Sequence, residues 1–318
     1  MGCASMFTPT LDRQKNVRTF VAMMVKKYNF NQKELLNLFQ QVKIQPRTLT
    51  NIQHPYEEQP WYIYRNHLIT PRRINDGLHY WQQHATVLQY AQNKYGIPAS
   101  IIVAIIGIES NYGQTQFQYR TFDALATLSF CYPKRAPFFK QELEEYLLLI
   151  QKLNVDPLSI YGSYAGAIGP AQFMPSTYRR FAVSYKPAQT PDIINNHNDA
   201  IVSVANFLKQ QGWQAHRFIA VRAKITNNTT ITSQKQTIAQ FAKHGIIAPK
   251  KIARKNWALF IPLQEKNSFE YWLGLNNFMV LMRYNSNINY AMAVYSLSSQ
   301  LISANHPKAA KLNINFSQ

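Results

Sequence analysis

The sequence predicts an α+β fold that is mostly α-helical, with a small strand-rich insertion at residues 216–284. Three observations support this class. Apolar residues recur at helical spacing, between capping and terminating residues, over most of the first 215 positions. An unbroken apolar run, Ile101–Ile108, has the length of a buried core segment. After Trp213 the chain changes to short runs of β-branched and aromatic residues.

The N-terminal region predicts three helices. Val17–Tyr28 carries apolar residues at helical spacing, and Asn31 is an N-cap with a glutamate three residues later, which opens the second helix. A polar, proline-containing stretch at residues 46–60 links this pair to the aromatic segment Trp61–Tyr64. Thr70-Pro71 is a cap followed by a proline at the first helical position, and Gly96 is a stop. We therefore expect one long third helix between them.

The centre of the chain predicts a buried helix that starts at Ile97-Pro98 and is apolar almost all round through Ile108. It runs into Glu109, and Gly113 ends it. A loop with three glycines at residues 162–172 lets the backbone approach a ligand closely but lacks the Gly-Lys-Ser/Thr ending of a phosphate loop. Further helices are expected at Phe122–Phe130, Gln141–Leu153, Pro175–Ser184 and Asn198–Gln211.

The C-terminal third predicts strands, one short helix at residues 234–244 and a last helix at Tyr290–Asn305. The strand-like runs are Phe218–Ile225, Thr229–Thr232, Trp257–Gln264 and Phe278–Tyr284. The predicted organisation is a flexible arm at 1–14, a helical subdomain at 15–96, a core at 97–215, the strand-rich subdomain at 216–284, and a helix with a tail at 285–318.

The charge of the chain is strongly positive, with 34 Lys and Arg against 15 Asp and Glu and a formal net charge of +19. A field of this size attracts polyanions, and nucleic acid, anionic lipid surfaces and anionic wall polymers all qualify. No nucleic-acid-binding motif accompanies the charge, and the basic residues are scattered along the sequence. We therefore predict no nucleic-acid partner.

The two cysteines allow several interpretations. Cys131 lies between Phe130 and Tyr132, where a small buried thiol is expected. The dipeptide Gly2-Cys3 matches the end of the processing site of bacterial lipoproteins, but no apolar leader precedes it here. Two interpretations therefore remain, a lipid anchor at Cys3 and a dipeptide that occurs by chance. A disulfide between Cys3 and Cys131 is a further alternative. No apolar run reaches the roughly 18 residues that span a bilayer.

Glu109 is placed unlike the other acids of the chain. It follows an eight-residue apolar run at the exit of a helix that should be buried. Burial disfavours the charged form of a carboxyl and raises its pKa, which is what a general acid needs to hold a proton at neutral pH. The alternatives are a glutamate paired with one of the many Lys and Arg residues, or one exposed just beyond the helix.

A second catalytic carboxylate, which most glycosidases use, does not stand out. Asp123 opens an apolar helix and has the position of a first-turn acid. Glu142, with Glu144 and Glu145, is expected on the solvated face of its helix. A mechanism with one carboxylate, in which the substrate supplies its own nucleophile, is therefore the better expectation.

Six sequence blocks in the same order resemble the membrane-bound lytic murein transglycosylase B family. The resemblance extends from about residue 16 to Ser298. It continues beyond the six blocks into Arg283-Tyr284-Asn285 and Tyr290–Val294. The blocks are Ile105–Gly113, Thr121–Phe130, Tyr132–Arg135, Gly162–Gly169, Gln172–Ser176 and Asp199–Asn206.

The resemblance implies a lysozyme-like catalytic core of the goose type at 97–215, with a flanking helical subdomain and a small antiparallel β subdomain. It also implies non-hydrolytic cleavage of the β-1,4 bond between N-acetylmuramic acid and N-acetylglucosamine in peptidoglycan, which leaves a 1,6-anhydromuramyl end. The family motifs place the catalytic acid/base at Glu109. They place ligand contacts at Tyr64, Lys134, Arg135, Ser163, Gln172, Tyr284, Asn285 and Tyr290.

The chain departs from the family pattern at three places. Lys134 stands where an arginine is common, and Phe207 stands where some members carry a tyrosine. Some members carry a calcium loop in the segment that corresponds to residues 184–199. Here that segment holds only two acids, Asp192 and Asp199, with two prolines and no glycine. Oxygen ligands are too few for a Ca²⁺ site, so we predict no metal and no cofactor.

Three functions are compatible with these features. A lytic transglycosylase is supported by Glu109 and the six blocks. The departures at Lys134 and Phe207 leave room for a wall-binding protein without turnover, and nucleic-acid binding rests on the net charge alone. The favoured function implies peptidoglycan strands as partner, with other wall enzymes as further candidates. It also implies a monomer in the periplasm, anchored to the outer membrane if Cys3 is lipidated.

Overall fold

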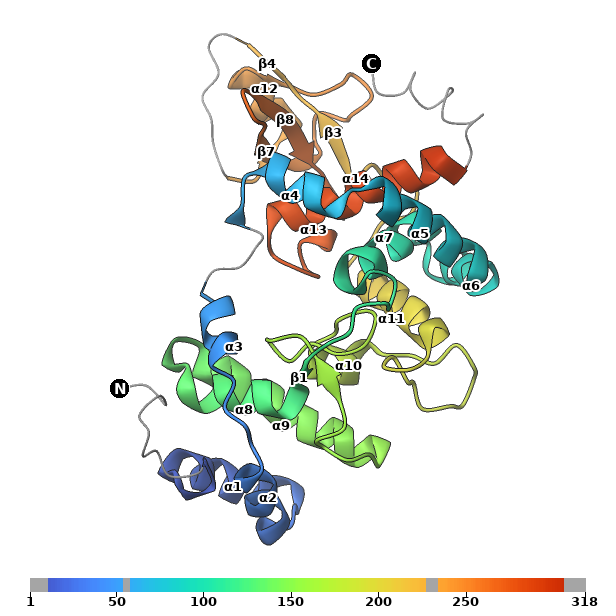
Figure 1. The fold of residues 1–318 in the computed structure, drawn as a ribbon. Helices are drawn as coiled ribbons and strands as arrows, with labels where there is room; N and C mark the ends of the chain where they lie inside the picture. Colours follow the sequence, from blue (N-terminus) through green and yellow to red (C-terminus); the bar gives the residue numbers. More distant parts are fainter. Residues whose placement is uncertain (1–10, 54–57, 227–233, 306–318) are drawn as a thin grey trace. The chain divides into compact units, whose positions relative to one another are not determined.

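The structure, a computed structural model, describes residues 11–53, 58–226 and 234–305 (Figure 1). The chain packs as two compact units, each made of two segments of the sequence. Unit 1 comprises residues 1–55 and 115–181, and unit 2 comprises residues 56–114 and 182–318. The α+β class with mostly helical content is confirmed. The predicted division into five segments remains a prediction. Among the described helices, none combines the length and the apolar composition that crossing a bilayer requires.

Unit 1 begins with a helical pair. The short turn η1 (Leu11–Arg13) leads into α1 (Lys15–Tyr28) and α2 (Gln32–Gln40), and α3 (Pro46–Asn51) follows. The Asn31 side chain accepts a hydrogen bond from the backbone N–H of Glu34, as the capping pattern predicts. Phe20 and Phe39 pack edge to face and both contact Phe130, so the helical pair buries its apolar faces against the helix that contains Phe130, α8 (Thr121–Cys131).

The rest of unit 1 is built on α8 (Thr121–Cys131), η3 (Pro133–Arg135), α9 (Ala136–Leu153) and α10 (Pro175–Phe181). Helix α9 packs against both α8 and α10. Two short strands, β1 (Tyr119–Arg120) and β2 (Tyr161–Gly162), pair antiparallel and hold the entry to α8 beside the start of the glycine loop. Cys131, expected as a buried thiol, is partly exposed and disulfide-bonded. Cys3 lies outside the described residues.

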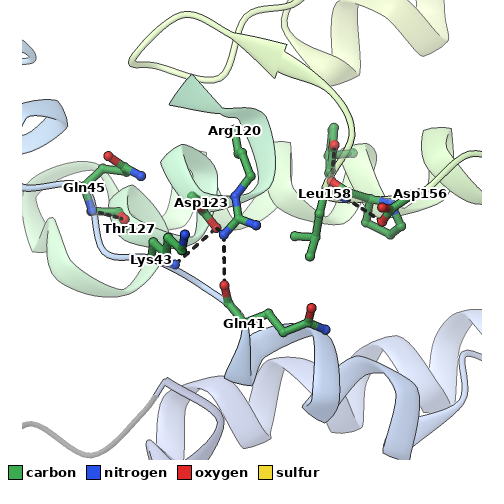
Figure 2. Close-up of polar contacts among 10 residues, drawn as sticks. Gln41, Lys43, Gln45, Arg120, Asp123, Thr127, Asp156 and Leu158 are labelled. Carbon is green, nitrogen blue, oxygen red and sulfur yellow. Dashed lines mark hydrogen bonds and ion pairs between the residues drawn. The ribbon is translucent and has the colours of Figure 1, made fainter. Parts of the chain in front are cut away.

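Asp123 anchors the segment between α2 and α3 (Figure 2). Its carboxylate is fully buried and accepts two hydrogen bonds from the Arg120 guanidinium, at 2.7 and 3.0 Å, and one from the backbone of Lys43 at 3.3 Å. The same guanidinium donates to the carbonyl of Gln41 at 2.9 Å. Every oxygen of this carboxylate is thus engaged inside unit 1, which agrees with the structural role expected for Asp123.

The helices of unit 2 surround α7 (Ala99–Ser110). Helix α7 packs against α5 (Pro71–Gln83), α6 (Ala85–Tyr95), α11 (His197–Gln210) and α14 (Ile288–Asn305), and α14 also contacts α4 (Trp61–Leu68). Residues 99–107 of α7 are all buried, so it is the central helix that its composition predicts. The single long helix expected from Thr70 to Gly96 is wrong, because the backbone leaves helical geometry at His84.

The β subdomain belongs to unit 2. Its main sheet has the antiparallel order β3-β8-β7-β5, and β4 (Lys224–Ile225) pairs with β6 (Ile246–Ile247). The helix α12 (Ile238–Lys243) contributes Phe241 to a core with Phe260 and Leu273. The strands of the main sheet are β3 (Ala220–Arg222), β5 (Gln236–Thr237), β7 (Trp257–Gln264) and β8 (Phe269–Gly274).

The last predicted strand is wrong. Residues 278–284 form instead most of helix α13 (Asn276–Leu281) and the turn after it. The reason lies in the burial spacing, since Asn277, Phe278, Val280 and Leu281 are buried with the spacing of a helix and not of a strand. The run Thr229–Thr232 lies outside the described residues.

Candidate active site

Glu109 lies in the last turn of α7, where the burial of the helix changes. All residues of α7 up to Gly107 are buried, whereas Glu109 is partly exposed. Asn111 and Tyr112 then adopt left-handed backbone angles, φ 49° and 62°, and stop the helix. The Ser110 hydroxyl donates to the carbonyl of Ile106 and accepts from the N–H of Gly113, which fixes this turn. The acid therefore projects from a rigid helix end with access to solvent.

Tyr290 is the polar partner of Glu109. Its hydroxyl donates a hydrogen bond to Oε1 of Glu109 at 2.6 Å. Tyr290 is only 2% exposed and lies in the first turn of α14, so the bond joins two helices that pack against each other. Burial and the nearby charge of Glu109 raise the pKa of Tyr290 well above its usual value. The phenol therefore stays protonated and acts as a donor to the carboxyl.

Further aromatic side chains pack next to Tyr290. The Tyr284 ring stacks on the Tyr290 ring with centroids 6.3 Å apart, and Phe207 meets Tyr284 edge to face at 5.1 Å. Burial and the charge of Glu109 raise the pKa of Tyr284 as well. Tyr64, on α4, is 3% exposed and is close enough for its electrostatic interaction to contribute to the raised pKa of Tyr290. Unit 2 thus brings three predicted tyrosines to the Glu109 side of α7.

Asn285 takes part in holding this arrangement. Its side-chain oxygen accepts the backbone N–H of Asn287 at 3.1 Å. The side-chain oxygen of Asn287 in turn accepts the N–H groups of Asn289, at 2.7 Å, and Tyr290, at 3.4 Å, at the start of α14. Asn287 is not among the residues predicted for the site, although an Asn immediately before an apolar helix is a recognisable capping signal.

Four of the predicted ligand residues lie in unit 1. Two of them are in the glycine loop. The hydroxyl of Ser163 accepts the N–H groups of Ala165 and Ala167, and the side chain of Gln172 donates to the carbonyl of Gly169 at 2.8 Å. Gln172 also has a left-handed backbone with φ 48°. Both side chains therefore shape the loop from within, and their contacts with a ligand remain predictions.

The other two residues, Lys134 and Arg135, lie in η3 and are exposed. The Arg135 guanidinium packs over the ring of Phe138 at 4.6 Å and lies 5.3 Å from the ring of Phe139. This leaves the charged pair at the surface of unit 1, where it is open to an anionic group. Its role in binding stays a prediction.

The expectation that Glu142 lies on the solvated face of its helix is wrong. Glu142 is 3% exposed, and its two oxygens accept the backbone N–H and the hydroxyl of Ser176 at 3.0 and 2.6 Å. Burial raises the pKa of Glu142, and the two hydrogen bonds from Ser176 oppose part of that rise. The carboxyl caps the start of α10, which makes it structural. On the same helix, Glu144 bonds to Tyr28 and Lys27, and Glu145 pairs with Arg179 at the surface.

The segment that corresponds to the calcium loop of some family members is closed by hydrogen bonds of the protein itself. Asp199, 2% exposed, accepts the N–H groups of Tyr185 at 2.8 Å and Asp192 at 2.9 Å, one on each oxygen. Asp192 accepts the N–H groups of Ile194 and Asn195 on one oxygen. Carboxylates committed to backbone donors do not fit Ca²⁺, which needs six to eight oxygen ligands. Over the parts of the chain that the structure describes, no three His, Cys, Asp or Glu side chains gather as metal ligands.

Comparison with known proteins gives a consistent result. The family model described as the transglycosylase SLT domain matches residues 12–299. Membrane-bound lytic murein transglycosylase B of Escherichia coli (strain K12) is 36% identical over an alignment of 294 residues, which covers 89% of this chain and 81% of that protein.

Two solved structures are similar over almost their whole length. The structure of the catenated lytic transglycosylase SltB1 from Pseudomonas aeruginosa matches with a TM-score of 0.87 and 38% identity. The match covers 92% of this chain and 99% of the SltB1 chain. The Escherichia coli lytic transglycosylase Slt35 in complex with calcium has a TM-score of 0.86 and 35% identity, and covers 92% of this chain and 94% of its own.

Proposed function

The chain belongs to the transglycosylase SLT family, and we propose that it is a lytic transglycosylase that cleaves the β-1,4 bond between N-acetylmuramic acid and N-acetylglucosamine in peptidoglycan. The observation that carries the proposal is the contact between Glu109 and Tyr290, which places one acid with a phenolic partner at the end of the buried helix α7. The names of the relatives support murein as the substrate.

The proposed mechanism uses Glu109 twice. Its protonated form gives the proton to the glycosidic oxygen as the bond from C1 to that oxygen breaks. Its carboxylate then takes the proton from the C6 hydroxyl of the muramyl residue, whose oxygen bonds to C1. The glutamate is regenerated, no water enters, and the product carries a 1,6-anhydro ring. The Tyr290 hydroxyl, held as a donor, orients the carboxyl in both steps.

The structural roles of the other acids support a mechanism with one carboxylate. Asp123 is paired with Arg120, Glu142 caps α10, and Asp199 closes the segment before α11. Each of these buried carboxylates is already committed to partners within its own unit. A nucleophile from the substrate supplies what a second carboxylate would supply in other glycosidases.

We propose roles for the remaining predicted residues by their chemistry. The partly exposed Tyr284 ring provides an apolar face for a sugar ring, whereas Tyr64, only 3% exposed, reaches the glycan with its edge alone. Asn285 provides an amide for a hydroxyl or N-acetyl group. Lys134 and Arg135 are suited to the carboxylates of the stem peptide. Ser163 and Gln172 shape the glycine loop so that its backbone can approach the glycan.

The test is digestion of purified sacculi, with mass spectrometry of the released muropeptides. The expected products carry 1,6-anhydromuramyl ends, which are lighter by one water than the reducing ends made by a hydrolase. Glu109→Gln should release nothing, while Glu34→Gln, which removes an exposed carboxyl on α2, should behave as the parent. Reducing-end products, or a Glu109→Gln variant as active as the parent, would contradict the proposal. Full binding without turnover in the parent chain would favour a wall-binding protein instead.

The compartment follows from the substrate. We propose the periplasm, and the disulfide at Cys131 is in keeping with an oxidising compartment. We also propose that the chain acts as a monomer on glycan strands, with other wall enzymes as partners. Sedimentation and pull-down from periplasmic extracts test these two points.

The outer-membrane anchor is a separate proposal that rests on Gly2-Cys3 and competes with the disulfide at Cys131. A lipid anchor would be attached to the sulfur of Cys3. The sequence has two cysteines, so an internal disulfide at Cys131 would need the same Cys3 sulfur, and the two modifications exclude each other. Intact mass measurement with and without reductant therefore decides between them. A diacylglyceryl mass on the chain supports the anchor, whereas an unmodified chain that gains two hydrogens on reduction contradicts it.

A further inference from the structure

The β subdomain carries a large share of the positive charge of the chain. Residues 216–275 contain ten lysines and arginines and only two acids, a net charge of +8 out of +19. All ten cationic side chains are exposed. Both acids are already paired, Glu265 with Arg65 at 2.6 Å and Glu270 with Arg222 at 3.0 Å. The field of this subdomain is therefore almost entirely uncompensated within it.

Six of these cations lie in one loop of the subdomain or on segments that contact it, and we call this group the basic edge. The loop from Pro249 to Asn256 runs beside the start of α12, because Ile238 and Ala239 donate backbone hydrogen bonds to the carbonyls of Asn256 and Arg254. Ile252 anchors the loop in the subdomain core. Its four cations are then held on a fixed backbone. Lys235 contacts the ring of Trp257, the residue after the loop, and Arg217 precedes Phe218, whose ring contacts Lys251 of the loop. The cations of the basic edge are Arg217, Lys235, Lys250, Lys251, Arg254 and Lys255.

Two large aromatic side chains lie within the basic edge. Trp257 is 53% exposed and Phe218 is 48% exposed, although rings of this size are normally buried. The ammonium of Lys235 lies 5.8 Å from the Trp257 ring, and that of Lys251 lies 5.0 Å from the Phe218 ring. Each exposed ring thus has a cation beside it. Ile247, on β6 of the same subdomain, is 38% exposed and adds an aliphatic side chain.

We propose that the basic edge binds the surface of an anionic phospholipid bilayer. Lysine and arginine attract the headgroup phosphates, and tryptophan and phenylalanine beside them insert into the boundary between headgroups and acyl chains. An exposed isoleucine fits such a surface but adds nothing to the recognition of nucleic acid. The mode of attachment is interfacial. It needs neither a spanning helix nor Cys3, and it is independent of Glu109.

The experiment is cosedimentation of the full chain with vesicles of phosphatidylglycerol and phosphatidylcholine, compared with vesicles of phosphatidylcholine alone. Binding is expected only to the anionic vesicles and should weaken as salt is raised. Lys250→Gln with Lys255→Gln should lower the affinity roughly 30-fold, since each lysine near the surface contributes about fivefold. Lys33→Gln with Lys152→Gln removes the same charge from exposed positions of unit 1 and is the matched control.

A second readout tests the aromatic contact directly. Tryptophan fluorescence of the parent should shift to shorter wavelength on anionic vesicles, and Trp257→Phe should abolish most of the shift while keeping an apolar ring. The proposal is overturned if anionic vesicles are not bound, or if the unit 1 control weakens binding as much as the basic-edge variant. It is also overturned if the basic-edge lysines control affinity for a single-stranded oligonucleotide at about 0.15 M salt and not for vesicles.

Discussion

The Tyr290 hydroxyl is the most direct test of how the chain controls its acid. Tyr290→Phe removes the donor to Glu109 and keeps the ring that stacks on Tyr284. A hydrogen bond to a charged group contributes about 1.5–3 kcal/mol. If the reacting carboxyl loses the same amount of stabilisation in the transition state, the rate of glycan cleavage falls by roughly 10- to 100-fold. The unfolding free energy should fall by about 1.5–3 kcal/mol as well.

The control for this variant lies on the same helix. Tyr295→Phe removes a partly buried phenol from α14, where the ring packs on Trp272, and should leave cleavage unchanged. Turnover of soluble glycan fragments and thermal unfolding are measured together. Equal losses of activity in both variants would show that the effect comes from the helix and not from the contact with Glu109.

Glu142, unlike the partly exposed Glu109, is a buried acid that stabilises the fold instead of reacting. Glu142→Ala leaves the N–H and hydroxyl of Ser176 without their acceptor at the start of α10. The loss should cost about 1–3 kcal/mol of unfolding free energy, measured in urea. Glu145→Ala, on the same helix, breaks a surface ion pair and should cost less than about 1 kcal/mol. The opposite order would contradict the capping role.

These two acids show where sequence reasoning about the site succeeds and where it stops. Glu109 stands out because an apolar run leads directly to it, so the residues that precede it in the sequence already indicate its apolar surroundings. Glu142 does not stand out, because Ser176 is 34 residues away and a charged cluster with Glu144 and Glu145 has the appearance of a solvated face. A local sequence pattern does not show whether a residue is buried by segments that are distant in the sequence.

At the scale of elements, caps and continuous apolar runs predict well. The cap at Asn31 and the apolar run of α7 both appear as expected, and β7 spans Trp257–Gln264 as predicted. The errors fall where a tertiary contact decides. The break at His84 lies inside a good helical pattern, and residues 278–284 have strand-like composition although the core holds them as a helix.

The break at His84 brings a histidine pair together. The rings of His84 and His197 stack with centroids 5.4 Å apart, and the Tyr80 hydroxyl lies 3.1 Å from Nδ1 of His197. Burial lowers the pKa of both histidines, and His84 lowers that of His197 further. The folded state therefore favours the neutral rings, while the unfolded chain titrates near its ordinary pKa of about 6.5.

The histidine pair should make the fold less stable at mildly acidic pH. Between the lowered pKa values and about pH 6.5 the unfolded state binds more protons, so the unfolding free energy falls as the pH falls through this window. Thermal unfolding from about pH 7.5 to about pH 5.5 should show the loss. His197→Gln should flatten the dependence, and His244→Gln, at the exposed residue directly after α12, should not. A parent chain with constant stability across the window would contradict this account.

At the scale of the whole molecule, the charge excess predicts how salt acts on stability. Ion pairs such as Arg120–Asp123 and Arg179–Glu145 offset part of the charge, yet 34 Lys and Arg against 15 Asp and Glu leave a net charge of +19. Screening weakens both attraction and repulsion, and the repulsion is the larger sum here. The melting temperature should therefore rise between about 0.05 M and about 0.5 M NaCl, by about 2–4 °C for each kcal/mol of repulsion removed.

Calcium separates this general effect from a specific site. Asp199 and Asp192 already accept backbone hydrogen bonds, so the segment before α11 is closed without an ion. At constant ionic strength, about 1 mM CaCl₂ should leave the melting temperature where EDTA leaves it. Asp199→Asn should lower the melting temperature equally with and without calcium, because the lost acceptor serves backbone N–H groups. A rise with calcium in the parent that Asp199→Asn removes would show that the carboxylate exchanges its backbone donors for a metal ion.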